Sequence, residues 1–163
     1  LGDVYKRQDV IKAREHEAVK EMIYQSCLIK GGVVERDPKE KGERALLNLG
    51  HTIGHAVEKL KDFRLLHGQC VAIGLVAAAY ISYQRGLLTE DEYNKIKEGC
   101  ILYELPIHVD GLEETAVLAA TRKDKKMEQG QVKFVLMKGI GGSFIDHTVS
   151  DEEMLAGIRE ILK

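Results

Sequence analysis

GQCVAIGLVAAAYISYQR, residues 68–85, is the most apolar segment of the chain, and we expect the fold to be built around it. It is rich in alanine and carries little polar surface, which is typical of a helix that is buried on all sides. Gly86 follows directly and is well placed to end this helix. The longest uncharged apolar run, Cys70 to Ile81, is far shorter than the roughly 20 residues that a membrane span requires. The segment therefore predicts the central helix of a globular domain.

The flanking segments also have mostly helical patterns. We expect further helices at residues 10–30, 43–60, 89–103, 112–122 and 150–162. Thr89 and Ser150 each begin a capping-box pattern, because Glu92 and Glu153 follow them three residues later. Gly31-Gly32 and then Asp37-Pro38 are expected to break the first of these helices.

One short segment has a β-like pattern. Val132 to Met137 is a short β-like run, and Gly139 to Gly142 predicts a turn after it. No internal repeat or low-complexity segment is visible. The sequence therefore predicts a mainly α domain with one short strand or hairpin.

The composition excludes several classes of protein. Hydrophobic residues make up 44% of the chain and charged residues 31%, the balance of a globular protein. The net charge of −2 gives no reason to expect a nucleic-acid partner, and no segment predicts membrane association. Cys27, Cys70 and Cys100 are odd in number and widely spaced, so we expect reduced thiols, buried in helices, in a cytoplasmic protein.

The first eight residues differ in character from the rest. Leu1 to Gln8 has no initiator methionine and no clear periodicity, and it resembles a translated sequencing adapter. We therefore expect native sequence to begin near Asp9, and the helical domain to occupy residues 9–163.

The segment RALLNLGHTIGHAVE, residues 44–58, contains the polar groups best suited to chemistry. On one continuous helix, Arg44, Asn48, His51 and His55 would share a face, because they are four, three and four residues apart. Two histidines at i and i+4 can bind one zinc ion, with a third ligand from elsewhere. The alternative is a histidine pair satisfied by hydrogen bonds on a helix surface. Adding His67 favours a polar binding site over that alternative.

Two glycines lie within this predicted helix. Gly50 and Gly54 each cost about 1 kcal/mol relative to alanine in a helix interior. Such a cost is tolerated where another backbone or a ligand must approach closely. We therefore expect a close neighbour at these positions.

Several motifs in fixed order resemble the 3-dehydroquinate synthases, and the resemblance spans essentially everything after residue 8. The motifs are Cys27-Leu28-Ile29-Lys30, Val33-Val34, Glu40, Arg44, Leu47-Asn48, Gly50-His51-Thr52, Gly54-His55-Ala56, Glu58, His67-Gly68, Val71-Ala72-Ile73-Gly74, Asp124-Lys125-Lys126, Val135-Leu136 and Ile140-Gly141. The chain departs from the family pattern at Pro38 and Gln69, where glutamate is usual. Both departures spare the residues with proposed roles.

The resemblance assigns roles that differ from those predicted by spacing alone. It implies that His51 and His67 are the metal ligands, with an upstream glutamate as the third, and that His55 transfers protons beside the metal. The remaining roles implied by the resemblance are substrate binding by Lys30, Arg44, Asn48 and Lys125 or Lys126, and organisation of the site by Glu40. We count Lys30, Arg44, Asn48 and Glu40 with His55 as catalytic residues.

The resemblance also implies a reaction, a set of cofactors and a fold. The fold would be the helical C-terminal domain of the dehydroquinate synthase-like fold. The family converts 3-deoxy-arabino-heptulosonate 7-phosphate, a sugar-acid phosphate, into 3-dehydroquinate and phosphate in the shikimate pathway. It uses NAD as a transient oxidant, and Zn²⁺ or Co²⁺. An N-terminal NAD-binding domain precedes this region in the family, so we expect this fragment to be inactive alone and the intact enzyme to be a homodimer.

Three other functions remain open from the sequence. A sister sugar-phosphate cyclase that makes a valiolone or an inosose would share the NAD and the metal histidines. A metal-dependent polyol dehydrogenase would lack the set of anion-binding residues. A non-catalytic helical module would use its histidines only for structure.

Overall fold

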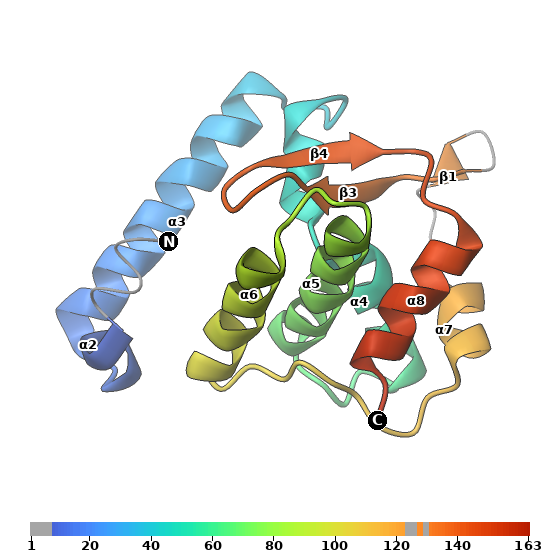
Figure 1. Cartoon of the computed structure of the whole chain (residues 1–163). Helices are drawn as coiled ribbons and strands as arrows, with labels where there is room; N and C mark the ends of the chain where they lie inside the picture. The colour runs from blue at the N-terminus through green and yellow to red at the C-terminus, as the bar shows by residue number, and fades with distance from the viewer. Residues whose placement is uncertain (1–7, 123–126, 129–130) are drawn as a thin grey trace. The chain divides into compact units, whose positions relative to one another are not determined.

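A computed structural model describes residues 8–122, 127–128 and 131–163 of the chain (Figure 1). The chain divides into two compact units, Leu1–Leu47 and Asn48–Lys163. In chain order the elements are α2 (Gln8–Lys12), α3 (His16–Arg36), a 3₁₀ helix η1 (Glu43–Asn48), α4 (His51–Leu60), α5 (His67–Gln84), α6 (Glu90–Leu102), α7 (Glu114–Thr121), β1 (Met127–Glu128), β2 (Gln131–Val132), β3 (Phe134–Met137), β4 (Ser143–Asp146) and α8 (Asp151–Ile161). The predicted mainly α class is confirmed.

The first unit is dominated by the long helix α3, and here the predicted break at Gly31-Gly32 is wrong. The helix continues through both glycines to Arg36. Glycine lowers helix stability by about 1 kcal/mol but leaves the hydrogen-bonding pattern possible. The predicted break at Asp37-Pro38 is confirmed, with Asp37 at φ −137° and ψ 70°, because a residue that precedes proline is pushed out of the α region. Cys27, which we expected to be buried, is exposed on this helix.

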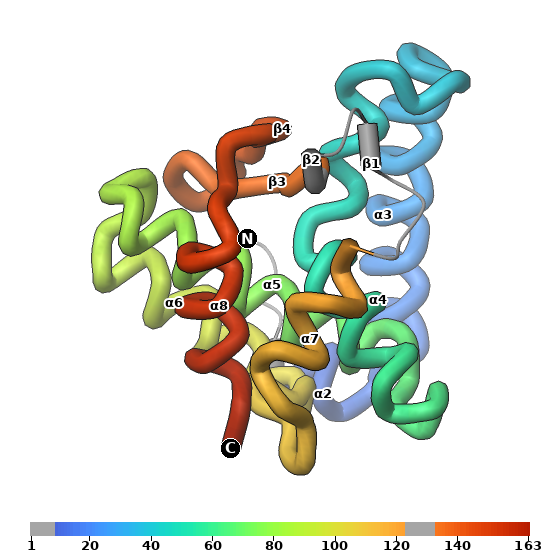
Figure 2. Tube along the Cα trace, turned by 90° about the vertical axis from the view of Figure 1, so that its right-hand side faces the viewer, coloured from blue at the N-terminus to red at the C-terminus, as the bar shows by residue number. Residues whose placement is uncertain are grey.

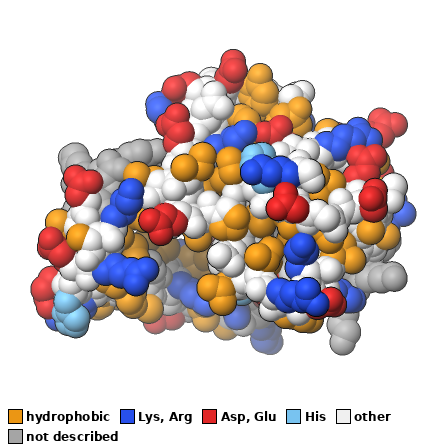
Figure 3. All heavy atoms as spheres, turned by 90° about the horizontal axis from the view of Figure 1, so that it is seen from below, with side chains coloured by type: hydrophobic (Ala, Val, Ile, Leu, Met, Phe, Trp, Pro, Cys, Tyr) orange, Lys and Arg blue, Asp and Glu red, His pale blue; other side chains and the backbone are white. Residues whose placement is uncertain are grey.

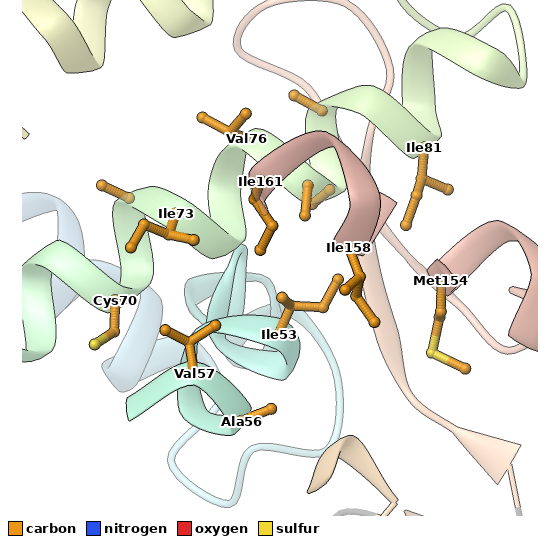
Figure 4. Close-up of a cluster of buried hydrophobic side chains, with 14 of the residues drawn as sticks. Ile53, Ala56, Val57, Cys70, Ile73, Val76, Ile81, Met154, Ile158 and Ile161 are labelled. Carbon is orange, nitrogen blue, oxygen red and sulfur yellow. The ribbon is translucent and has the colours of Figure 1, made fainter. Parts of the chain in front are cut away.

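The second unit is built around α5, as the sequence predicts. Helices α4, α6 and α8 pack against α5, and α7 packs against α4 and α8 (Figures 1 and 2). Their buried side chains form one core, in which Ile53 and Val57 of α4 meet Ile73 of α5 and Ile158 of α8 (Figure 4). Ten residues of α5 are buried, as the scarcity of polar residues in this segment predicts.

The β structure consists of two short antiparallel ladders. β1 pairs with β2, and β3 pairs with β4 from Phe134↔Asp146 to Met137↔Ser143. The second hairpin lies over the C-terminal end of α5 (Figure 1), where the Met137 amide donates a hydrogen bond to Ser82 Oγ at 3.0 Å. The predicted turn at Gly139–Gly142 connects its strands, with Gly139 and Gly141 at positive φ.

Local signals at helix ends are confirmed. Thr89 and Ser150 form the predicted capping boxes with Glu92 and Glu153. Gly86 has φ +69° directly after α5 and its C-cap, a left-handed conformation that glycine adopts at little cost.

On the face that Figure 3 shows, acidic and basic side chains of the described residues are interspersed with apolar atoms, and no large area of one charge is visible. Among the described helices, none is both long enough and apolar enough to cross a membrane.

Candidate metal centre

Residues 43–60 do not form the single helix that the sequence predicts. They form η1 and then α4, separated by Leu49 and by Gly50, which has φ +78°. The single helical face expected to carry Arg44, Asn48, His51 and His55 therefore does not exist. Periodicity could not reveal the break, because an isolated glycine is compatible with both a helix interior and a left-handed turn.

Gly50 and Gly54 allow α4 to approach α5 closely, which agrees with the close neighbour expected at these two positions. A Cβ atom on Gly50 would lie 2.7 Å from both Leu75 N and Val71 O, and one on Gly54 would lie 2.8 Å from Cys70 O. Real Cβ atoms do not come so close to backbone atoms, so both positions require glycine. The neighbour that these glycines accommodate is the backbone of α5.

This close crossing brings three histidines together. His51 is the first residue of α4, His55 lies one turn later, and His67 is the first residue of α5. Among the described residues they form a group in which one ligand atom from each lies within 4.8 Å of the others. The ring centroids are 5.2 Å apart for His51 and His55 and 5.4 Å apart for His51 and His67.

The donor set and spacing fit a zinc-type ion. Imidazole nitrogens bind Zn²⁺ at about 2.0–2.1 Å, so two ligands of a tetrahedral ion lie about 3.4 Å apart. Side-chain rotations would close the remaining gap within the 4.8 Å group. His51 and His55 are partly buried, whereas the side chain of His67 is 55% exposed. The group is therefore open on the side of His67, where a further ligand or a substrate hydroxyl could reach a bound ion.

The protonation of His51 is set by its backbone neighbour. His51 Nδ1 lies 3.1 Å from the carbonyl oxygen of Leu49. A carbonyl oxygen only accepts hydrogen bonds, so this contact places the proton on Nδ1. In this tautomer Nε2 carries the lone pair with which an imidazole binds a metal.

Gln69 has a structural role at the start of α5. Its side-chain oxygen accepts a hydrogen bond from the Leu66 amide at 3.0 Å, directly before His67. An amide oxygen and a carboxylate can both accept this bond. The departure at this position therefore leaves the helix start that holds His67 intact.

The first unit contains a loop ordered by Asp37. The Asp37 carboxylate accepts hydrogen bonds from the backbone amides of Lys41, Gly42 and Arg44, at 3.0, 2.8 and 3.1 Å. The hydrogen bonds from Lys41 and Gly42 are the main reason why the pKa of Asp37 is lowered. The Arg44 side chain donates to the Pro38 carbonyl oxygen at 2.8 Å. The loop thus holds two of the predicted site residues, Glu40 and Arg44, in defined places within this unit.

The other predicted substrate-binding residues lie in different parts of the chain. Lys30 is exposed on α3 in the first unit, and Asn48 is the last residue of η1. Lys125 and Lys126 lie outside the described residues.

Sequence reasoning gave no role to Glu58, although the motif includes it. Its carboxylate lies 3.3 Å from His67 Nδ1. The available signal was its spacing, since Glu58 follows His51 and His55 by seven and three residues on the same helix.

The chain is similar in sequence to 3-dehydroquinate synthases. A family model described as 3-dehydroquinate synthase C-terminal matches residues 3–127. A 3-dehydroquinate synthase of Ruminiclostridium cellulolyticum is 44% identical over 130 residues, which are 80% of this chain and 36% of that protein. One of Syntrophotalea carbinolica is 38% identical over 143 residues, 87% of this chain and 40% of that protein. The chain thus spans less than half the length of these relatives.

Two solved structures share the fold. A 2-epi-5-epi-valiolone synthase from Streptomyces hygroscopicus, with NAD⁺ and Zn²⁺ bound, matches with a TM-score of 0.85 over 97% of this chain and 44% of its own. A 2-deoxy-scyllo-inosose synthase complexed with carbaglucose-6-phosphate, NAD⁺ and Co²⁺ matches with a TM-score of 0.74 over 90% of this chain and 42% of its own. Both are 22% identical to this chain. On the family match and the identity to the curated relatives, the chain belongs to the 3-dehydroquinate synthase C-terminal domain family.

Proposed function

We propose that this chain is the metal- and substrate-binding part of a 3-dehydroquinate synthase. The whole enzyme would convert 3-deoxy-arabino-heptulosonate 7-phosphate into 3-dehydroquinate and phosphate in the cytoplasm, as a homodimer with NAD. The observation that supports this most is the convergence of His51, His55 and His67 at the crossing of α4 and α5.

The three histidines would divide two tasks. His51 and His67 would hold a Zn²⁺ or Co²⁺ ion, and a ligand from another part of the enzyme would complete the set. A bound ion of this kind makes a coordinated hydroxyl easier to deprotonate. His55 is partly buried beside the two ligands, so it could accept or return a proton at a substrate hydroxyl.

The predicted polar residues would hold the charged ends of the substrate. Lys30, Arg44, Asn48 and Lys125 or Lys126 supply cationic and amide donors, which suit a carboxylate and a phosphate. The carboxylate of Glu40 would organise this set. Fixing the substrate in one orientation lowers the entropic part of the barrier.

NAD would have to bind elsewhere in the enzyme. Oxidation of a ring hydroxyl and its later re-reduction need a nicotinamide, and no strand followed by a GxGxxG turn is visible in this sequence. We propose that a preceding NAD-binding domain supplies it, and that this chain alone has no turnover.

The test is phosphate release from the heptulosonate phosphate by the intact gene product with NAD, before and after metal removal. The expected result is metal-dependent release of phosphate with formation of 3-dehydroquinate. Absence of release from a folded, metal-loaded enzyme would contradict the proposal.

A sister cyclase activity is the second candidate, because the two solved structures that share the fold have that chemistry in their names. Identity of 38–44% to curated 3-dehydroquinate synthases, against 22% to the sister cyclases, favours the first candidate. Formation of a valiolone or an inosose by the intact enzyme, in place of 3-dehydroquinate, would reverse that preference.

A further inference from the structure

Glu58 contacts His67 across the crossing of α4 and α5. Its Oε1 lies 3.3 Å and its Oε2 lies 3.5 Å from His67 Nδ1, so both carboxylate oxygens face the same ring nitrogen. The Glu58 side chain is only 17% exposed, whereas that of His67 is 55% exposed. The Glu58 side chain is thus more restricted by its neighbours than the His67 side chain, so Glu58 can fix the orientation of the His67 ring.

The carboxylate touches His67 without being part of the histidine group. The group whose ligand atoms lie within 4.8 Å of one another comprises His51, His55 and His67 among the described residues, and Glu58 is not a member. A carboxylate that contacts one imidazole from outside such a group matches the outer partner of a metal-bound histidine.

The Glu58 carboxylate lies beside the first turn of α5. His67 is the first residue of the 18-residue helix α5, and the partial positive charge of a helix N-terminus attracts anions. Cys70, in the first turn of the same helix, has its pKa raised by burial and then by the negative charge of Glu58. Two residues of this first turn therefore interact with the same carboxylate.

We propose that Glu58 is a positioning residue that keeps the Nδ1 proton on His67 and so directs the Nε2 lone pair towards the metal. Leu49 O acts on His51 in the same way, so both ligands would present Nε2. That Nε2 of His67 binds a metal rests on the proposed function. That Glu58 keeps the proton on Nδ1 of His67 concerns this chain alone.

The tautomer is tested on the metal-free 163-residue chain by NMR of the imidazole nitrogens, above the pH at which His67 titrates. We expect His67 to be mainly Nδ1–H in the wild type. In Glu58→Leu it should shift towards the Nε2–H form that free histidine prefers. In Glu58→Gln it should stay mainly Nδ1–H, because the amide oxygen still accepts the bond. Glu98→Gln, at an exposed glutamate on α6, is the control and should change nothing. An unchanged tautomer in a folded Glu58→Leu variant would overturn the proposal, as would an Nε2–H form in the wild type.

Titration of the intact enzyme with Co²⁺, followed by visible absorption, tests the effect on metal binding. We expect Glu58→Leu to weaken binding by about 10- to 100-fold, and Glu58→Gln to weaken it less, with the shape of the spectrum kept in both. If both variants lose binding and change the spectrum alike, Glu58 is itself a ligand and the positioning role is wrong. If His51→Ala and His67→Ala lose binding but Glu58→Leu does not, the metal site stands and the positioning role fails. An intact, folded enzyme that binds no Co²⁺ would count against the metal site, and the NMR result would still decide the role of Glu58.

Discussion

The backbone of Gly74 lies directly against that of Gly50, so that a Cβ atom on Gly74 would overlap the Gly50 carbonyl oxygen. The same Cβ would lie 2.6 Å from the Gly54 amide nitrogen. The three nearest atoms belong to the backbone, which cannot rotate away as a flexible side chain can. This contact sets the distance between α4 and α5, and the candidate metal centre depends on that distance.

Gly74→Ala should therefore be strongly destabilising. We expect a loss of about 3 kcal/mol or more in the free energy of unfolding, at the upper end of overpacking effects, because one helix must move. Urea unfolding measures it. Gly99→Ala is the matched control, since a Cβ at this glycine of α6 meets no atom within 4 Å. That variant should be unchanged or more stable by up to about 1 kcal/mol. Equal effects of the two variants would contradict the close-contact explanation.

The three histidines should differ in what they contribute to the intact enzyme. His51→Ala and His67→Ala should lose bound zinc, because each removes a proposed ligand. His55→Ala should retain zinc and lose about 10²- to 10⁴-fold in kcat, because it removes a proton-transfer group. Metal content after desalting and phosphate release with NAD measure the two effects. Loss of zinc from His55→Ala with retention in His67→Ala would restore the i, i+4 pair as the metal ligands.

Stability should fall in acid as Glu153 is protonated. Arg85 donates to its two carboxylate oxygens at 2.6 and 2.8 Å, and this pairing is the main reason why the pKa of Glu153 is lowered to about 2. Because the folded-state pKa lies below the ordinary value of 4.5, the contribution is complete above pH 4.5 and is lost as the pH falls towards 2. Glu153→Gln should cost about 1–3 kcal/mol at pH 7 and progressively less below pH 4.5. Urea unfolding at several pH values measures this.

The control for this prediction is an ion pair on the surface. Glu114 pairs with Arg159, whose side chain is 60% exposed. Glu114→Gln should cost no more than about 1 kcal/mol at any pH, because solvent screens the pair. A cost for Glu153→Gln that does not decrease below pH 4.5 would show that the Arg85 pair is not its source.

Ser82 should be important for the junction between α5 and the β3–β4 hairpin. Its fully buried hydroxyl donates to Ala78 O at 2.8 Å and accepts from the Met137 amide at 3.0 Å. Ser82→Ala would leave that amide buried without this partner, at a cost of about 1–3 kcal/mol. Ser26→Ala removes the same kind of helix hydrogen bond, to Met22 O, from an exposed site and should stay within about 0.5 kcal/mol. Thermal unfolding of both variants tests the difference.

Much of the helical framework could be predicted from local signals. The buried helix at 68–85, the capping boxes at Thr89 and Ser150, and the turn at Gly139–Gly142 all depend on residues that are close in sequence. The errors at Gly31-Gly32 and Gly50 have one origin. Glycine permits both a helix and a left-handed turn, so its neighbours in space decide which one forms.

The sequence by itself determined which residues are available to the site and which family motifs they form. Spacing placed His51, His55 and Glu58 on one helix, because residues three and four apart share a face. The family motifs implied that His67 joins them, although helical spacing could not, and tertiary structure alone decided how close the rings lie and that Glu58 faces the Nδ1 of His67. The physical reason is that His67 follows His55 by twelve positions and begins a different helix, so no helical period relates them. Their distance is set by the crossing of α4 and α5, which the missing Cβ atoms at Gly50, Gly54 and Gly74 make possible.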